Sequence, residues 1–291
     1  MTAARILRGL PFPDYLALPG VHSSTLKAIE TSPRHYQRAI ASERDSDAMR
    51  LGRVVHALTL TPDAPPDVAV WDGGRRAGKA WAEFCAEHAG KTIVRAEELE
   101  VAHAMRRAVY AHPKARALLS EGEPEVTITW DERIEPGERP TVASLACKIR
   151  IDWLRADGTI VELKTTRAIA PRAWAREYAA RYYHAQAALY RMGLDASDVL
   201  GVAPPPPYVI AVENTAPFDV AVYRVPDATI EAGARKVRDW LRKVAECEAA
   251  GVWPGVGGDD AADLVLPAWA ETDGLEDVDV SGIEGGGDGG E

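Results

Sequence analysis

The sequence has few cysteines, no long apolar run and no basic residues near its C-terminus, and each absence excludes a class of protein. Its three cysteines among 291 residues, Cys85, Cys147 and Cys247, lie far apart, which argues against a disulfide framework or a cysteine-rich metal site. No apolar stretch approaches the roughly 20 residues of a membrane span. The first 20 residues show no secretory signal. We therefore expect a cytoplasmic protein with reduced thiols and no membrane contact.

The acidic charge of the chain is concentrated at one end. The formal net charge is −10, and residues 255–291 contain eleven Asp or Glu but no Lys or Arg. The remainder therefore carries a net charge of only +1, and a near-neutral body can still hold a basic groove. A Gly-rich acidic segment has too few apolar residues to form a core. We predict an irregular N-terminus over 1–20, one folded domain over 21–254 and a disordered acidic tail over 255–291.

Hydrophobic periodicity predicts strands in the middle of the chain and helices on both sides of them. Helical spacing is found over residues 47–60, 79–89, 96–111, 171–192 and 227–250, a further helix is expected to begin at Pro33, and Gly193 is expected to end the helix that begins at Pro171. Alternating apolar residues predict strands near 126–130, 147–153, 160–165, 208–213 and 218–224. This order predicts an α/β (α+β) fold with a central mixed sheet, flanking helices and a helical N-terminal part.

The strongest chemical signal is a pair of carboxylates and a lysine on two adjacent predicted strands. Asp152 precedes a predicted turn, and Glu162-Leu163-Lys164 follows it. Glu162 and Lys164 share a face because side chains alternate along a strand. Two carboxylates can hold Mg²⁺, and a lysine beside them can orient water and offset charge on a phosphate. The alternative interpretation is a surface hairpin with a cross-strand Lys–Glu pair.

The length of the turn decides whether these carboxylates can meet. A two-residue loop at Asp157-Gly158 would place Asp152 and Glu162 on opposite faces of the sheet. A three-residue loop pairs Arg155 with Thr159 instead, and sets Asp152 opposite Glu162 on one face. Glycine suits the left-handed position that such a loop requires. We therefore predict an odd-length connection between the two strands.

Two helical motifs accompany the hairpin. Gly52 and His56 lie four residues apart on one helical face, where a glycine leaves room for a strand or a ligand. The alternative for His56 is a half-buried structural histidine. Gln186 and Tyr190 share a face of a later helix, with Tyr183 one turn earlier. This polar face could contact DNA, and its alternative is ordinary amphipathic patterning.

Taken in order, G-x(3)-H, D-x(9)-E-x-K and Q-x(3)-Y resemble the pattern of the RecB-like branch of PD-(D/E)xK nucleases. Seven short stretches narrow the resemblance to the RecE family (exonuclease VIII), and they keep their order over roughly residues 20–250. These stretches are residues 24–27, 32–36, 51–58, 90–93, 111–113, 163–166 and 183–190.

The resemblance implies a role for each motif. His56, Asp152, Glu162 and the Leu163 carbonyl would bind Mg²⁺, for which Mn²⁺ could substitute, and Lys164 would be the catalytic lysine. Gln186 and Tyr190 would position DNA, with Tyr183 one turn earlier on the same helix. Independently of the resemblance, Arg53, Arg172 and Arg176 are candidate phosphate contacts. Some relatives carry a four-cysteine iron–sulfur cluster, which the scattered cysteines of this chain do not predict. The lack of a G-x(4)-G-K-[ST] loop predicts that ATP is not needed.

The resemblance also implies an activity. We expect a Mg²⁺-dependent exonuclease that digests double-stranded DNA 5′→3′ from its ends and leaves 3′ single strands for phage-type homologous recombination. A single-strand annealing protein would be its partner, and the chain would form a homo-oligomer. Two alternatives remain open: a single-strand or flap nuclease of the same fold, and a weakly catalytic DNA-binding recombination scaffold. The intact set of Asp152, Glu162 and Lys164 argues against the scaffold.

Overall fold

The computed structural model describes residues 4–41, 46–64, 66–134, 143–257, 261 and 263–266. The chain divides into two compact units, Met1–Gly255 and Val256–Glu291. The fold below is that of the first unit. Most of the tail predicted to be disordered lies outside the described residues. Within the described part, no helix is both long and apolar enough to cross a membrane.

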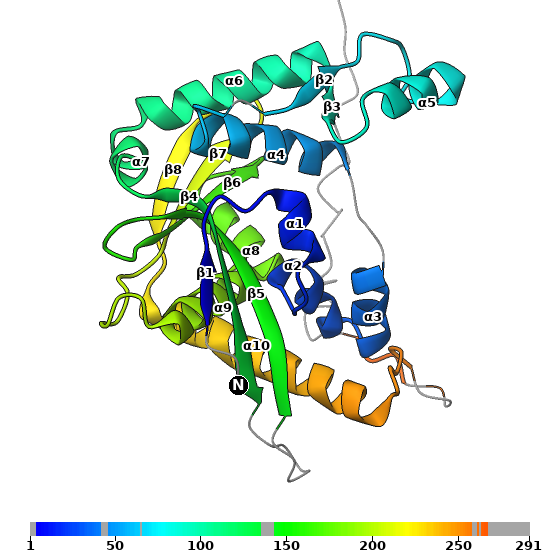
Figure 1. Cartoon of the computed structure of the whole chain (residues 1–291), viewed down its shortest axis with the longest axis vertical. Helices are drawn as coiled ribbons and strands as arrows, with labels where there is room; N and C mark the ends of the chain where they lie inside the picture. The colour runs from blue at the N-terminus through cyan, green and yellow to red at the C-terminus, as the bar shows by residue number, and fades with distance from the viewer. Residues whose placement is uncertain are drawn as a thin grey trace, which may run out of the picture. The chain divides into compact units, whose positions relative to one another are not determined.

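A mixed six-stranded sheet forms the centre of the first unit (Figure 1), in the order β1-β4-β5-β6-β7-β8. Its strands are β1 (Arg5–Leu7), β4 (Glu123–Ile134), β5 (Ala143–Leu154), β6 (Ile160–Thr166), β7 (Tyr208–Glu213) and β8 (Val220–Arg224). The strands β6 and β7 run parallel, and the other neighbours are antiparallel. The predicted central mixed sheet is therefore confirmed. A small separate parallel pair, β2 (Val68–Val70) and β3 (Thr92–Val94), was not predicted.

Helices cover the sheet in two groups. The first half of the chain contributes α1 (Phe12–Ala17), α2 (Ser23–Leu26), the 3-10 helix η1 (Lys27–Glu30), α3 (Pro33–Ala41), α4 (Asp47–Leu60), α5 (Gly78–Glu87), α6 (Ala96–Ala111) and α7 (Pro113–Leu118). The second half contributes α8 (Pro171–Ala180), α9 (Tyr183–Ser197) and α10 (Asp227–Ala250). In Figure 1, α4 and α6 lie over β6, β7 and β8, whereas α9 and α10 pack on β4 and β5.

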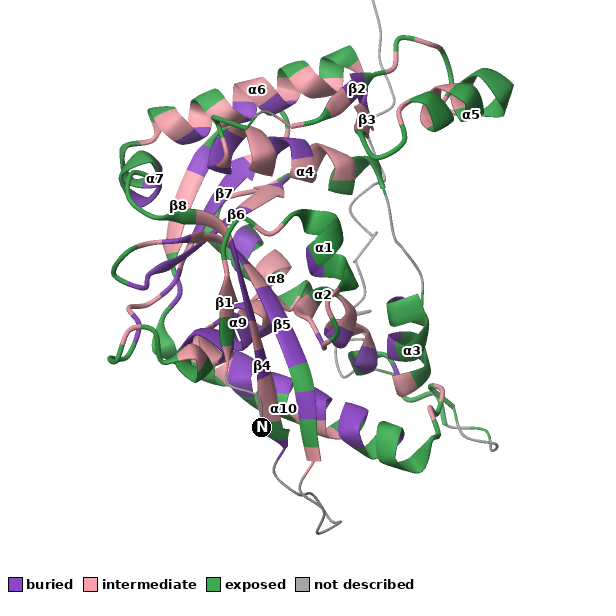
Figure 2. Ribbon diagram, in the orientation of Figure 1, coloured by how far each residue is buried: buried purple, intermediate pink, exposed green. Residues whose placement is uncertain are grey.

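Two large apolar clusters hold these layers together (Figure 2). The first joins β4 and β5 to α9 and α10, with Ile149, Ile151 and Trp240 almost fully buried. The second joins β6 and β7 to α4 and α6, with Val55 and Ile210 fully buried. Each such side chain contributes roughly 1.5–3 kcal/mol by leaving water. The first cluster therefore anchors the sheet at β5 and the second anchors it at β6, on either side of the junction between these two strands.

The long helix predicted from Pro171 to Met192 is corrected to two helices. The chain breaks between α8 and α9, where Tyr182 takes a left-handed φ of 58°. The predicted stop at Gly193 is also wrong, since α9 continues to Ser197. A Cβ on Gly193 would lie 2.7 Å from both Ile149 and the ring of Trp130. This glycine therefore permits close packing of α9 on the sheet.

The prediction of an irregular N-terminus over residues 1–20 is corrected as well. Arg5–Leu7 form the edge strand β1 against β4, and α1 follows. Neither element has a visible period, because three strand residues and six helical residues are too few to show one. Contacts distant in sequence stabilise α1: the Lys148 ammonium donates to the carbonyls of Tyr15 and Leu16, each at 3.0 Å.

Candidate active site

The loop between β5 and β6 has the predicted odd length. The Arg155 N–H donates to the Thr159 carbonyl at 3.0 Å, which leaves three residues in the loop. Gly158 takes the left-handed conformation with a φ of 82°. The strand pairs next to the loop continue this register, so Asp152 stands opposite Glu162. The sequence argument about the turn is confirmed, because only this register allows a shared site.

The two strands separate at this pair of carboxylates, and side chains replace the backbone ladder. The Asp152 N–H donates to Glu162 Oε1 at 3.4 Å. In return, the Leu163 N–H donates to Asp152 Oδ2 at 2.9 Å. Each carboxylate is therefore held by the backbone of the opposite strand. The sequence analysis placed the Leu163 carbonyl at the site, and the structure adds the amide of the same residue.

Helix α9 supports Glu162 and Lys164. The Lys164 ammonium donates to Glu162 Oε2 at 2.8 Å, and it lies 5.0 Å from the centre of the Tyr183 ring. The Gln186 amide donates to the same Glu162 oxygen at 3.0 Å and to the Tyr190 hydroxyl at 2.9 Å. Tyr190 is buried. The structure thus gives Gln186, which is partly exposed, and buried Tyr190 a supporting role at Glu162, and their contact with DNA stays a prediction.

Helix α4 brings His56 to the other carboxylate. Its Nδ1 lies 3.5 Å from Asp152 Oδ1, and both side chains are partly exposed. A Cβ on Gly52 would meet Thr165 Oγ1 of β6 at 4.0 Å, an ordinary contact distance. The strand β6 therefore approaches this glycine as expected, but a residue with a Cβ atom would also fit here. His56 and Asp152 together link α4 to the end of β5.

The electrostatics distinguish the two carboxylates. Burial and the neighbouring charge of Asp152 raise the pKa of Glu162 to about 7, against the opposing effect of Lys164. Burial alone would raise the pKa of Asp152, but His56 and Lys164 lower it to about 2. Burial would likewise lower the pKa of His56, yet Asp152 reverses this effect and the pKa is raised. Asp152 is thus ionised well below neutral pH. At Glu162, the nearby positive charges only partly offset the effects of burial and of Asp152 on the pKa.

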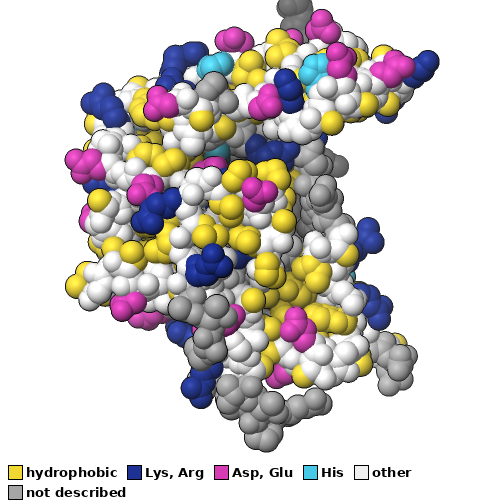
Figure 3. Space-filling model, in the orientation of Figure 1, with side chains coloured by type: hydrophobic (Ala, Val, Ile, Leu, Met, Phe, Trp, Pro, Cys, Tyr) yellow, Lys and Arg dark blue, Asp and Glu magenta, His cyan; other side chains and the backbone are white. Residues whose placement is uncertain are grey.

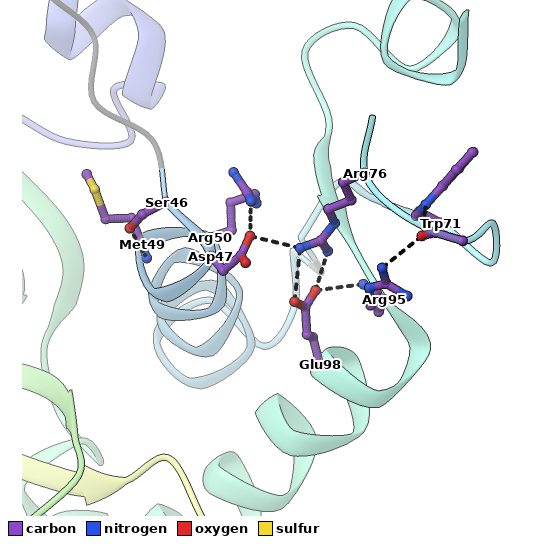
Figure 4. Close-up of polar contacts among 9 residues, drawn as sticks. Ser46, Asp47, Met49, Arg50, Trp71, Arg76, Arg95 and Glu98 are labelled. Atoms are coloured by element: carbon purple, nitrogen blue, oxygen red, sulfur yellow. Dashed lines mark hydrogen bonds and ion pairs between the residues drawn. The ribbon is translucent and has the colours of Figure 1, made fainter. Parts of the chain in front are cut away.

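A polar cluster fixes the N-terminal end of α4 (Figure 4). Ser46 caps the helix by accepting from the Met49 N–H at 3.2 Å. Arg76 donates to Asp47 at 2.9 Å and to Glu98 Oε1 at 3.1 Å, which ties α4 to α6. These contacts fix the position of α4, the helix that carries His56. Their charges are balanced, since Arg50 also pairs with Asp47.

The donor set fits a hard divalent cation. Mg²⁺ is usually bound by one or two carboxylates and keeps several water molecules, and Asp152 and Glu162 provide such a pair with His56 beside it. Burial, and after it the charge of Asp152, raise the pKa of Glu162, and a cation bound here would favour its ionised form. Among the described residues, no three Asp, Glu, His or Cys side chains already converge on a common point. His56 and Lys164 contact the carboxylates instead.

The predicted basic contacts lie outside this core. Arg53 lies on α4, partly buried, three residues before His56. Arg172 and Arg176 are exposed on α8, about one helical turn apart. Figure 3 shows Lys and Arg side chains gathered in the hollow between α4 and α1. A basic surface of this kind suits a phosphate backbone.

Sequence analysis missed two basic residues of β5. Lys148 and Arg150 precede Asp152 by four and two residues, so strand alternation places all three on one face. Lys148 is buried, and the Arg150 guanidinium donates to the Leu10 carbonyl at 2.6 Å. A signal for them is present in the sequence, because polar residues alternate here with Cys147, Ile149 and Ile151. Both basic residues fasten the N-terminal segment to β5.

A mixed sheet with opposed carboxylates and a lysine at a strand junction defines the PD-(D/E)xK class of proteins. Comparison with known families agrees: residues 22–262 match the model of the "PDDEXK-like domain of unknown function (DUF3799)". The chain belongs to this family, and through it to the PD-(D/E)xK nuclease superfamily. Members of that superfamily generally use divalent metal ions.

A solved structure shows a similar fold. The "Putative exonuclease" from Eubacterium rectale matches with a TM-score of 0.55 and 13% identity, over 87% of this chain and 92% of the other. The protein SSO0001 matches with 14% identity over 82% of this chain and 92% of the other, with a TM-score of 0.28 that is too low to indicate a shared fold. No curated protein matches the sequence significantly.

Proposed function

We propose that this protein is a Mg²⁺-dependent exodeoxyribonuclease that acts on the ends of double-stranded DNA. The observation that carries the proposal is the opposed pair of Asp152 and Glu162 at the β5–β6 junction, with Lys164 bonded to Glu162. Membership of a PD-(D/E)xK family supports nuclease chemistry. The similarity to a protein named an exonuclease and the RecE-like stretches of the sequence support digestion from an end.

Each side chain of the site has a part in this chemistry. A bound divalent ion would supply Lewis acidity for phosphodiester hydrolysis. Asp152 and Glu162 would hold it, together with neutral His56 and the Leu163 carbonyl. The Lys164 ammonium has three donors and uses one on Glu162, so the others can orient an attacking water or bind a phosphate oxygen.

The RecE-like resemblance refines the proposal. It suggests 5′→3′ digestion, 3′ single-stranded products for phage-type recombination, a single-strand annealing protein as partner and a homo-oligomeric assembly. The nearly neutral body of the chain supports DNA binding better than the total charge suggests, because residues 255–291 carry eleven acidic groups. Light scattering of the purified chain tests the assembly.

The activity is tested with linear duplex DNA labelled at the 5′ or the 3′ end, with a covalently closed circle of the same sequence as control. With Mg²⁺ we expect early release of the 5′ label from linear duplex and no cleavage of the circle. EDTA, or an Asp152→Asn substitution, should stop the reaction. Cleavage of the circle would overturn the exonuclease proposal. Preference for single-stranded or flap DNA would establish the alternative nuclease, and binding without cleavage would establish the scaffold.

A further inference from the structure

The side chain of Lys164 is largely enclosed, and an aromatic ring lies beside its ammonium. Only 14% of this side chain is exposed. The ammonium donates to Glu162 Oε2 at 2.8 Å and lies over the ring of Tyr183, 5.0 Å from its centre. The face of an aromatic ring attracts a cation within about 6 Å, and the attraction is larger where water is excluded. Tyr183 therefore contributes to the position of the Lys164 ammonium.

The break between α8 and α9 creates this arrangement. Tyr178 on α8 and Tyr183 on α9 have ring centres 5.7 Å apart, with one ring edge-on to the other. In one continuous helix, residues five apart would point about 140° away from each other around the axis. The left-handed φ of 58° at Tyr182 turns the chain between them. The break thus brings the ring of Tyr183 back against α8.

The ring of Tyr183 is held in place by other aromatic side chains. Its centre lies 6.1 Å from that of Trp174, which is buried on α8 and packs in one cluster with Val209 and Ala211 of β7. Tyr178 contacts the same indole, with ring centres 6.0 Å apart. A ring with two aromatic neighbours has little freedom to turn. Tyr183 therefore presents a fixed face to the ammonium.

The cavity next to the lysine is too small for a substrate group. It encloses about 10 Å³ and is lined in part by Glu162, Lys164, Tyr178, Tyr183 and Gln186. This volume is roughly that of a single water-sized sphere, so a sugar or a base cannot enter it. A DNA group could come between Tyr183 and Lys164 only if the side chains moved apart.

The lysine needs a partner besides Glu162. Its ammonium sits on a flexible four-carbon stem, and one hydrogen bond does not fix its direction. A divalent ion held by Asp152 and Glu162 would share the Glu162 oxygens and repel the ammonium. The face of Tyr183 attracts the ammonium without using a carboxylate lone pair. It can therefore keep Lys164 in place at a filled metal site, and it leaves an N–H for water or phosphate.

We propose that Tyr183 is a positioning residue, whose ring face holds the Lys164 ammonium at the metal site by a cation–π contact. This inference rests on the proposed nuclease function and deepens it, because it gives Tyr183 a partner within the protein. Sequence reasoning placed Tyr183 at the DNA instead. The two roles differ in their kinetics: loss of a positioning contact lowers kcat, whereas loss of a DNA contact raises KM.

The test changes the charge distribution of the ring while keeping its shape. Position 183 of the full chain is replaced by phenylalanine and by its mono-, di- and trifluorinated forms, introduced at an amber codon. Each fluorine draws electron density from the ring face and weakens its attraction for a cation. In cleavage of end-labelled linear duplex with Mg²⁺, kcat should fall with each fluorine, by roughly tenfold over the series, while KM stays constant. DNA affinity in Ca²⁺, measured by fluorescence anisotropy, should not change.

The same fluorinated series at Tyr208 is the matched control. The Tyr208 ring lies 4.9 Å from the ammonium of Lys114 on α7, so it has a cation–π contact of nearly equal length with a different lysine. Fluorination there should leave kcat unchanged. Rates are compared per folded molecule, and thermal unfolding of the fluorinated chains should match that of Tyr183→Phe.

Each contrary outcome has a distinct meaning. A kcat that stays constant across the Tyr183 series, or falls equally in the Tyr208 series, would overturn the inference and leave the nuclease proposal intact. A rise in KM with constant kcat would overturn it by placing the ring at the DNA. Loss of cleavage already in folded Tyr183→Phe would overturn it by assigning the effect to the hydroxyl. A wild-type chain that does not cleave DNA with Mg²⁺ would refute both proposals.

Discussion

Two clusters of opposed charges lie along α4, and they are compensated differently. At the N-terminal end, Asp47 and Glu98 share the Arg76 guanidinium, and Arg50 adds a second cation at Asp47. Two carboxylates there face two guanidinium groups. Guanidinium stays protonated at every accessible pH. The cluster is therefore a fixed structural joint between α4 and α6.

In the middle of α4, His56 contacts a second cluster, which has less positive charge than the first. Asp152 and Glu162 share one ammonium, Lys164, and a histidine whose charge depends on pH. The pKa of Glu162 rises to about 7 as a result of burial and of Asp152. Perturbed carboxyl groups of this kind mark functional sites more often than structural ones. Similar residue types thus build a joint where charges balance and a candidate cation site where they do not.

The largest expected effect comes from removing a carboxylate of the unbalanced cluster. Asp152→Asn or Glu162→Gln should reduce DNA cleavage by roughly a thousandfold or more, or about 4 kcal/mol, because a charged ligand is lost while the shape is kept. Initial rates on labelled duplex give the measurement. Glu98→Gln is the matched control, and it should cleave normally per folded molecule. Comparable losses in both clusters would erase the distinction between them.

Removing the shared cation of the balanced cluster should affect stability alone. Arg76→Met leaves Asp47 and Glu98 without their shared cation, and it should lower the free energy of unfolding by about 2–3 kcal/mol, since the site is only partly buried. Cleavage per folded molecule should remain near the wild-type value. Urea denaturation and activity at low temperature measure the two quantities separately. A variant with normal stability but no activity would place Arg76 in the active site.

The pH dependence of metal binding distinguishes the clusters further. Because the pKa of Glu162 in the folded chain lies above its ordinary value of 4.5, the metal-free chain should lose stability as pH rises from about 4.5 to about 7. A divalent cation needs the ionised carboxylate, so its affinity should rise by up to roughly tenfold per pH unit and level off above about 7. The raised pKa of His56 also makes the affinity for the cation increase with pH, because a protonated histidine cannot bind a metal ion. Thermal shifts with Mn²⁺ over this range give the measurement, and a flat profile would contradict the assignment.

The smallest predicted effect tests the support of Glu162. Tyr190→Phe removes the hydroxyl that accepts from Gln186, at a cost of about 1 kcal/mol. We expect cleavage to fall roughly fivefold in kcat, with little change in KM for DNA, because buried Tyr190 does not contact the substrate. A rise in KM alone would restore the DNA contact that the sequence suggested.

Sequence reasoning predicted the hairpin register because two constraints coincided. Strand alternation fixed which residues share a face, and a shared site for Asp152 and Glu162 allowed only an odd loop. The structure bears this out, with Gly158 in the left-handed conformation. Most helix and strand positions followed from periodicity in the same way. Local patterns therefore placed most of the longer elements, but they did not reveal the break between α8 and α9.

Contacts between distant segments could not be predicted from such patterns. The break at Tyr182 rotates α9 relative to α8, and it turns Gln186 and Tyr190 inward to Glu162. Helix α1 depends on Lys148, more than 130 residues later in the chain. A six-residue helix has too little periodicity to reveal such a partner. The acidic groups of the candidate site could thus be identified from the sequence. The N-terminal segment held by Lys148, and the support that α9 gives to Glu162, could be seen only in the structure.

Calorimetric titration with Mn²⁺ at pH 7.5 tests the central distinction most directly. We predict that the wild-type chain and an Asp47→Asn/Glu98→Gln variant bind the ion with similar heats and affinities. A folded Asp152→Asn/Glu162→Gln variant should give no binding heat above dilution. Equal binding by the Asp152→Asn/Glu162→Gln variant and the wild type would show that the ion is held elsewhere, and would contradict the assignment of the β5–β6 junction as the metal site.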